Sequence, residues 1–299
     1  MVKERSDFSD IDSMHQSVPI LLPSESADTA QTENTLTANI NVWGNTFKVR
    51  IAFEDKPTRL SELVPLARQL SSKITQSVME ELHQRNIRIP CGKGCCMCCR
   101  YLTPLCIPEA SRTAEEIYAA PPHRRRNLLQ AHLLAARQIM KSISTQLIIG
   151  QSQTADFTDL ADLKRLSHWY TALKLDCPFL NEGICTNYEQ RPLACREHLV
   201  IGSARQCRTE QSNGPQMLRM PLSILDCLAK LASELEQTEV DSVMLPMAPA
   251  WYNQNMQRAN RTWPAKYMLE KFLHILCKST SRSPSPFTCS DASVELISL

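Results

Sequence analysis

The sequence predicts a mainly α-helical fold with a small N-terminal β-hairpin and irregular loops that carry most of the cysteines. Three observations lead to this prediction. Several long segments place apolar residues at helical spacing. One stretch near the start alternates apolar and polar residues, as a half-buried β-strand does. Glycine, which supplies the left-handed turns of β-meanders, occurs only seven times among 299 residues, and its scarcity favours helices.

The chain divides into one folded domain between two predicted tails. Residues 1–37 are rich in Ser, Thr, Asp, Gln and Glu and hold few large apolar residues, so they cannot bury enough surface to offset their chain entropy. Residues 278–299 are rich in Ser and Pro and are also predicted to be disordered. The folded domain spans residues 38–277, and its cysteine motifs lie within residues 88–210.

Each element of the folded domain has a local signal. Apolar residues alternate on both sides of Trp43-Gly44-Asn45, which predicts a β-hairpin with a short turn. Ser223 and Asp226 resemble a capping box at a helix start. Helical periodicity predicts helices over residues 60–82, 108–117, about 124–149, about 156–173, 223–235 and 263–277.

The N-terminal sequence and the hydropathy pattern argue against export and against a membrane protein. No apolar stretch follows the charged residues at the start, so a secretory signal is not predicted. No window approaches the roughly 18 consecutive apolar residues that a membrane helix needs. We therefore expect a cytoplasmic protein, in a reducing compartment where clustered cysteines bind metal more often than they form disulfides. The 13 cysteines are odd in number and cannot all pair within one chain.

Composition also narrows the class of function. With 33 basic and 31 acidic residues, the formal net charge is +2, which indicates neither nucleic acid nor an anionic membrane as a partner. The seven glycines form neither a Rossmann fingerprint nor a P-loop. No Ser-His-Asp set and no carboxylate pair identifies catalytic residues, which stay unknown. The sequence therefore leaves open whether the protein is an enzyme.

The first of two cysteine motifs places five cysteines within nine residues, Cys91-Gly-Lys-Gly-Cys95-Cys96-Met-Cys98-Cys99. A two-residue gap lets two sulfurs face one ion around a tight loop, and the two glycines give the backbone the freedom that such a loop needs. Thiolates are strong ligands of Zn²⁺ and of iron–sulfur clusters, which typically take about four. Adjacent Cys98 and Cys99 cannot easily chelate one ion, so one of them suggests a second ion, a bridging role or a free thiol.

The second motif is looser and contains Cys177, Cys185, Cys195 and Cys207. Its longer gaps suit ligands that are gathered from separate turns. Arg191-Pro192 favours a helix start that places Cys195 in the first turn, where the helix dipole and neighbouring arginines stabilise a thiolate. His198 lies three residues after Cys195 on the same predicted helix face, and could be a metal ligand or a hydrogen-bonding partner of one.

Together the two motifs resemble those of the YkgJ-like family, the CxxCxxCC family of zinc- or iron-chelating cysteine-cluster proteins. The matching residues are Cys91, Gly94, Cys95, Cys98 and Cys99, then Thr103-Pro104 and Glu109, then Cys177-Pro178-Phe179-Leu180, Gly183, Cys185, Tyr188, Arg191-Pro192 and Cys195-Arg196. The resemblance covers about residues 88–210 and implies metal or iron–sulfur binding. Some relatives carry the name flagellin lysine N-methylase. Cys96 and Cys106 have no counterpart in the family pattern.

These observations lead to one expectation and one alternative. We expect the cysteine-rich loops to be organised around zinc, iron or an iron–sulfur cluster, with both motifs contributing to one region. The expected ligands are Cys91, Cys95, Cys98, Cys99, Cys177, Cys185, Cys195 and Cys207. The alternative is an iron–sulfur redox enzyme or an enzyme like a protein lysine N-methylase. The expected partner is a metal ion; a protein partner is left open, a membrane is not expected, and nucleic acid is disfavoured because basic and aromatic residues do not interleave around the cysteines.

Overall fold

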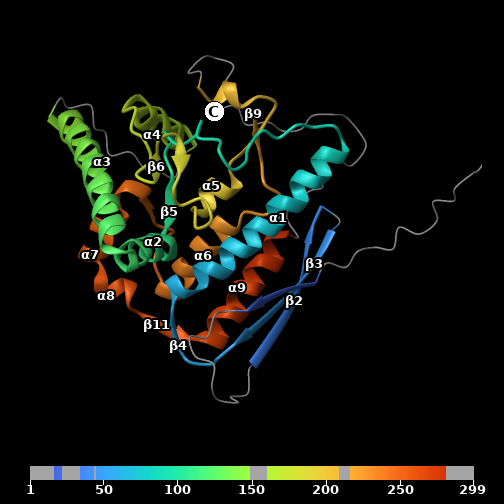
Figure 1. Ribbon diagram of the computed structural model, residues 1–299. Helices are drawn as coiled ribbons and strands as arrows, with labels where there is room; N and C mark the ends of the chain where they lie inside the picture. The colour runs from blue at the N-terminus through green and yellow to red at the C-terminus, as the bar shows by residue number, and fades with distance from the viewer. Residues whose placement is uncertain (1–16, 22–33, 44, 149–159, 209–215, 281–299) are drawn as a thin grey trace, which may run out of the picture.

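The structure is a computed structural model, and it describes residues 17–21, 34–43, 45–148, 160–208 and 216–280 (Figure 1). The helices are α1 (Val64–Gln84), α2 (Ile107–Ala119), α3 (Pro122–Ile148), α4 (Leu160–Ala172), α5 (Leu193–Glu197), α6 (Ile224–Glu236), α7 (Ala248–Gln254), α8 (Met256–Ala259) and α9 (Ala265–Thr280), with 3-10 turns η1 (Leu60–Leu63), η2 (Ala204–Arg208) and η3 (Leu245–Met247). The strands are β1 (Ser17–Leu21), β2 (Asn34–Val42), β3 (Asn45–Phe53), β4 (Pro57–Arg59), β5 (Pro104–Cys106), β6 (Leu180–Asn181), β7 (Ile184–Cys185), β8 (Leu199–Ile201), β9 (Gln216–Leu218), β10 (Ser242–Met244) and β11 (Thr262–Pro264).

Strands β2 and β3 form the predicted hairpin. They pair antiparallel from Asn34 opposite Phe53 to Val42 opposite Asn45. Strand β1 pairs in parallel with the other edge of β3, so β3 is the middle strand of a three-stranded sheet. Side chains alternate along β3, and Phe47, Val49, Ile51 and Phe53 are buried while their neighbours face outward. The apolar face of the hairpin packs against α9, which places this sheet on one flank of the helical body (Figure 1).

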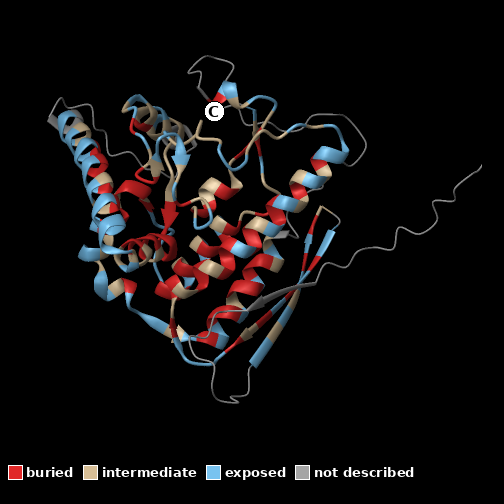
Figure 2. Ribbon diagram, in the orientation of Figure 1, coloured by how far each residue is buried: buried red, intermediate tan, exposed pale blue. Residues whose placement is uncertain are grey.

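The main core lies between the hairpin and three helices, α1, α6 and α9. Helix α1 crosses the middle of the molecule, and its buried stripe includes Leu66, Ile74 and Val78. Phe272 of α9 and Leu231 of α6 are fully buried in the same cluster. Figure 2 shows these helices buried along their facing sides and exposed along their outer sides, as amphipathic helices are.

A second apolar cluster supports the other side of the molecule. It joins α2, α7 and the β5–β10 pair, and Leu105, Phe179 and Val243 are among its buried members. The long helix α3 lies at the edge and exposes much of its outer surface, including Leu133 and Leu134 (Figure 2). The irregular segments that hold the cysteines lie above the two clusters, between α1 and α4 (Figure 1).

The predicted mainly helical class with a small hairpin is confirmed. The helix from Ser223 begins as expected, because the Ser223 hydroxyl accepts a hydrogen bond from the backbone N–H of Asp226. Four further antiparallel pairs, β4–β11, β5–β10, β6–β7 and β8–β9, were not predicted. Within the described ranges, no helix is both long enough and apolar enough to cross a membrane.

Two segments of the expected N-terminal tail are strands in the structure. Residues 17–21 form β1 and residues 34–37 belong to β2. Pairing with β3 supplies hydrogen-bond partners for the backbone of these residues. At the other end, α9 continues to Thr280. Residues 1–16, 22–33 and 281–299 lie outside the described residues.

Truncation of Phe272 tests the position of the core. Phe272 is fully buried, so Phe272→Ala should lower the free energy of unfolding by about 3–5 kcal/mol through lost burial and a residual cavity. Tyr267→Ala on the same helix removes a side chain that is 50% exposed and should change it by less than about 1 kcal/mol. Urea denaturation measures both values, and equal losses would contradict the core assignment.

Candidate metal centre

The first cysteine motif folds as a series of tight turns after α1. Three backbone hydrogen bonds close these turns, from Cys95 to Gly92 at 3.1 Å, from Cys99 to Cys96 at 3.1 Å and from Tyr101 to Cys98 at 3.0 Å. Gly94 has a φ of +92°, a conformation that side chains other than glycine rarely adopt. The tight loop that the spacing predicts is therefore present, and Gly94 is required by its backbone.

The second motif is built from three separate turns. Cys177 precedes a two-residue hairpin in which β6 pairs with β7, and this pairing sets Leu180 opposite Cys185. The turn residues Glu182 and Gly183 both have positive φ angles, as the primed turns of two-residue hairpins require. Cys195 lies in α5, which begins directly after Pro192 as the sequence predicted, and Cys207 lies in η2.

The two motifs meet in space. The backbone N–H of Cys177 donates to the carbonyl of Cys99 at 2.8 Å. The backbone N–H of Val200 donates to the sulfur of Cys91 at 3.4 Å, and the hydroxyl of Tyr101 donates to the carbonyl of Cys207 at 2.6 Å. Each contact joins residues that are far apart in the sequence. The expected meeting of the two motifs is thus present in the backbone.

The thiols interact electrostatically in two groups that share Cys98 as a neighbour. Burial raises the pKa of both Cys91 and Cys207, and negative charge on Cys95 and Cys98 contributes to both shifts. Together these effects raise the pKa of Cys207 to about 11. These four residues are called the first group here. Burial raises the pKa of Cys177 to about 12 and also raises that of Cys195, and charge on Cys98 adds to both.

The second group consists of Cys99, Cys177, Cys185 and Cys195. Charge on Cys177 and on Cys195 raises the pKa of Cys99, and charge on Cys185 raises that of Cys177. Between the groups, Cys99 donates a hydrogen bond to Cys98, which lowers the pKa of Cys98 and raises that of Cys99. Arg191 lowers the pKa of Cys98 further. All eight predicted ligands therefore belong to one connected set.

The side chains of this set do not already converge on a point. Among the residues that the structure describes, no group of three or more Cys, His, Asp or Glu side chains is arranged so that it could hold a metal ion. None of the twelve cysteines in the described ranges forms a disulfide. Backbone contacts thus bring the two motifs together, while the sulfur atoms lack the arrangement of a closed coordination shell.

The other two cysteines near the first motif have different surroundings. Cys106 is buried in the main core, and its sulfur donates to the Glu109 carboxylate at 3.7 Å. Burial and this carboxylate hold the pKa of the Cys106 thiol well above its usual value. Cys96 interacts electrostatically with Arg100, which forms an exposed ion pair with Asp176. Neither Cys96 nor Cys106 is among the charges that shift the pKa values of the thiols in the two groups. Neither is therefore added to the candidate ligands.

Helix α5 is held in place by three charged residues, the buried Glu109 and Arg196 and the partly buried Glu197, which we call the α5 anchor. Glu109 of α2 accepts a hydrogen bond from the backbone N–H of Leu193 at 2.8 Å, and so satisfies an N-terminal donor of α5. Glu197 at the other end accepts hydrogen bonds from Ser71 of α1 and from the backbone N–H of Ile224 at the start of α6.

Arg196 completes the anchor. Its guanidinium donates to the carbonyls of Arg191 and Glu189 and to the hydroxyl of Ser72 in α1. Burial, together with the neighbouring guanidinium of Arg191, lowers the pKa of Arg196 to about 10. Because Cys195 precedes Arg196 in a helix of five residues, these contacts fix the direction from which its thiol approaches Cys98 and Cys177.

His198 does not lie on the helix face that the sequence predicted. Helix α5 ends at Glu197, and His198 follows in an extended conformation. Its imidazole packs edge-on against the ring of Tyr101, with ring centroids 5.8 Å apart, and its buried Nε2 atom has no hydrogen-bond partner among the described residues. Burial lowers the pKa of His198, so the ring is neutral at neutral pH. The neutral ring is the form in which histidine binds metal.

Sequence reasoning missed Tyr101, Glu197 and the part that Glu109 takes in positioning α5. Glu109 was noted only as a residue that matches the family pattern. The contacts of these residues join segments far apart in the chain, so no local spacing could have identified them. Comparisons of the chain with models of protein families, with curated proteins and with solved structures gave no match.

The α5 anchor predicts a specific pH dependence. Burial raises the pKa of Glu109 from its usual 4.5 to about 7, so its carboxyl stabilises the fold fully below pH 4.5 and this contribution is lost as the pH rises through 7. Glu109→Gln keeps a hydrogen-bond acceptor for Leu193 and cannot ionise. The free energy of unfolding of the wild type should therefore fall relative to that of the variant between pH 4.5 and 8, by up to about 3 kcal/mol.

Chemical denaturation at a series of pH values measures this difference. Glu239→Gln, at an exposed position, is the matched control and should show no such trend. A difference between wild type and Glu109→Gln that stays constant over this pH range would contradict the buried state of Glu109.

Proposed function

We propose that this protein binds metal through thiolates from both cysteine motifs, with zinc or iron as the bound element, the latter also in the form of an iron–sulfur cluster. The observation that carries the proposal is the meeting of the two motifs, in which Cys177 is hydrogen-bonded to Cys99 and Val200 to Cys91. A fold that gathers eight thiols from two distant segments has few chemical uses other than coordination.

The donor set fits such a centre in number and in chemistry. The first group and the second group each offer four sulfurs, the number that zinc and iron–sulfur clusters typically take. Two four-ligand sites, or one cluster and one zinc ion, would use all eight. Bound zinc would stabilise the fold, whereas an iron–sulfur cluster would supply electron transfer.

Protonation of the free thiols also supports the proposal. Burial raises the pKa of Cys177 to about 12 and that of Cys207 to about 11, so both are neutral at pH 7 without a bound cation. Metal binding would release these protons and would therefore be weaker at low pH. Rotation about the one side-chain torsion of each cysteine would be required to bring the sulfurs into a shared shell.

We also propose that the chain is a relative of the YkgJ-like cysteine-cluster proteins. The resemblance rests on two composite motifs that occur in the same order as in that family. Their matching residues fall on structural features of the centre: Gly94 and Gly183 have positive φ angles, and Pro192 precedes α5. The remaining alternative is a redox or methylase-like enzyme that uses the same centre.

Elemental analysis with a visible absorbance spectrum, on protein purified without oxygen, tests the metal content. The proposal predicts about one zinc ion for each four-thiol group that holds zinc, and two or four iron atoms for a group that holds an iron–sulfur cluster. Zinc without colour would favour a structural or metal-handling role. Iron with acid-labile sulfide and a brown chromophore would favour the redox enzyme. Protein that is folded and free of metal would contradict the proposal.

Cysteine variants test whether both motifs take part. Cys98→Ser and Cys195→Ser should each lower the metal content and destabilise the fold by several kcal/mol, because the free energy of metal binding contributes to folding. Cys227→Ala is the control, since Cys227 lies in the core of α6 and outside both groups. It should destabilise the fold by about 1–2 kcal/mol and leave the metal content unchanged. Unchanged metal content in both serine variants would contradict a joint centre.

A further inference from the structure

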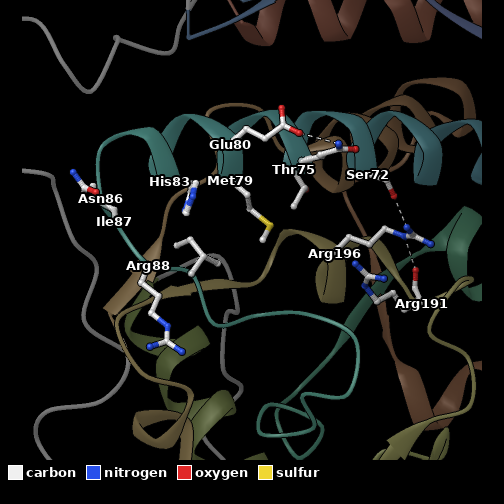
Figure 3. Close-up of a pocket in the computed structure, with 12 residues that line it drawn as sticks. Ser72, Thr75, Met79, Glu80, His83, Asn86, Ile87, Arg88, Arg191 and Arg196 are labelled. Atoms are coloured by element: carbon white, nitrogen blue, oxygen red, sulfur yellow. Dashed lines mark hydrogen bonds between the residues drawn. The ribbon is translucent and has the colours of Figure 1, made fainter.

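A cavity of about 740 Å³ lies next to the candidate metal centre, and its lining includes none of the eight candidate cysteine ligands. The C-terminal half of α1 forms one wall, and the segment that follows α1 forms the other (Figure 3). Arg191 and Arg196 of the second cysteine motif close one end. A cavity of this volume is large enough for a small organic molecule.

One part of the cavity is apolar. Met79 of α1 and Ile87 and Ile89 of the following segment line it, and all three are partly buried against the main core. In Figure 3, Met79 points from α1 into the space below the helix. The apolar part of a ligand would shield this surface from water. The apolar area buried in this way would contribute to the free energy of binding in proportion to its size.

The ends of the cavity are cationic. Arg191 stacks on the ring of Tyr188 at 4.0 Å and donates to the carbonyl of Tyr188 at 3.1 Å. Within the described ranges, no carboxylate forms an ion pair with Arg191, Arg196 or Arg88. The acid that lines the cavity, Glu80, accepts a hydrogen bond from Gln76 on the surface of α1. Arg191 and Arg88 therefore contribute positive charge to the lining, whereas the charge of Arg196 is partly balanced by Glu109 and Glu189.

Thr75 gives an independent sign of a ligand. It is 6% exposed and lines the cavity from α1 (Figure 3), while its hydroxyl oxygen is itself buried. Its hydroxyl has no hydrogen-bond partner in the described part of the chain, although a threonine inside a helix can usually bond to the carbonyl four residues earlier. An unpaired buried hydroxyl costs free energy, which a polar atom of a ligand would recover.

The helix dipole decides at which end an anion would bind. The C-terminal end of α1, which is the negative end of the helix dipole, lies near Arg88 and disfavours negative charge there. Arg191 and Arg196 lie at the opposite end, beside Ser72 and Thr75 in the middle of the helix (Figure 3). An anionic group is therefore best placed against Arg191, with Thr75 within the same half of the cavity.

We propose that this cavity binds a small amphipathic carboxylate. Its carboxylate would contact Arg191 and, after rotation about the side-chain torsion of Thr75, the Thr75 hydroxyl, and its apolar chain would lie on Met79, Ile87 and Ile89. The lining offers a single cluster of cations beside an apolar wall, which suits one acidic group attached to an aliphatic or aromatic body. The proposal does not depend on metal binding, and a ligand placed in this way would lie beside the cysteines.

Octanoate is a suitable probe, and isothermal titration calorimetry on the full chain measures its binding. The proposal predicts saturable binding of one octanoate per chain. Acetate lacks the apolar chain and 1-octanol lacks the charge, so each should bind about tenfold more weakly or not at all. Binding of octanol as tight as that of octanoate, or no saturable binding of octanoate, would overturn the proposal.

Variants locate the site. Thr75→Val should weaken octanoate binding about threefold, and Arg191→Met about tenfold or more. Ile87→Glu places a carboxylate on the apolar wall and should abolish binding. Arg126→Met, at an exposed position on α3, should have no effect. Octanoate binding that is unaffected by Thr75→Val and by Ile87→Glu would place the ligand elsewhere and overturn the proposal.

Metal content is measured on the same samples by elemental analysis, because Arg191 also lowers the pKa of Cys98. Loss of octanoate binding with unchanged metal content in Thr75→Val or Ile87→Glu would support the cavity alone. A wild-type protein that binds octanoate but contains no metal would contradict the proposed metal-binding function and leave the cavity proposal supported. The two proposals therefore fail on different readouts.

Discussion

The arrangement of the cysteines depends on how helix α5 is held. This helix has five residues, which is too few to be stable alone. It is fixed by buried and partly buried hydrogen bonds: Glu109 of α2 accepts from Leu193, Arg196 donates to Ser72 of α1, and Glu197 accepts from α1 and α6. Buried charged groups are costly unless they are fully paired, so this network specifies one position for α5. The thiol of Cys195 takes its place among the other cysteines as a result.

The same low-polarity surroundings affect the thiols themselves. Burial favours the neutral form of Cys91, Cys177 and Cys195, because a thiolate loses its hydration there. Cys98 differs, since it receives a hydrogen bond from Cys99 and lies near Arg191. Cys98 therefore ionises more readily than these buried thiols, which would lose their protons only together with the arrival of a cation. In this account, folding and metal binding are coupled through the cost of burying thiolates.

Local signals in the sequence were sufficient for much of the fold. The hairpin followed from alternation, α6 from Ser223 and Asp226, and α5 from Arg191-Pro192. Strands of two or three residues, such as β6 and β10, have no measurable periodicity and form only because a partner is present. The eight cysteines were chosen from motif spacing, but their division into two groups depends on contacts between distant segments. The anchor and the cavity depend on such contacts as well.

The central claim is that both motifs form one centre, and alkylation of the thiols in the presence and absence of metal tests it most directly. Protein purified without oxygen is treated with iodoacetamide before and after exposure to a chelator, and each modified cysteine is identified by mass spectrometry. The account predicts that Cys95 and Cys98 of the first motif and Cys177 and Cys195 of the second are protected together and become reactive together. Protection that is confined to one motif, or absent from both, would contradict it.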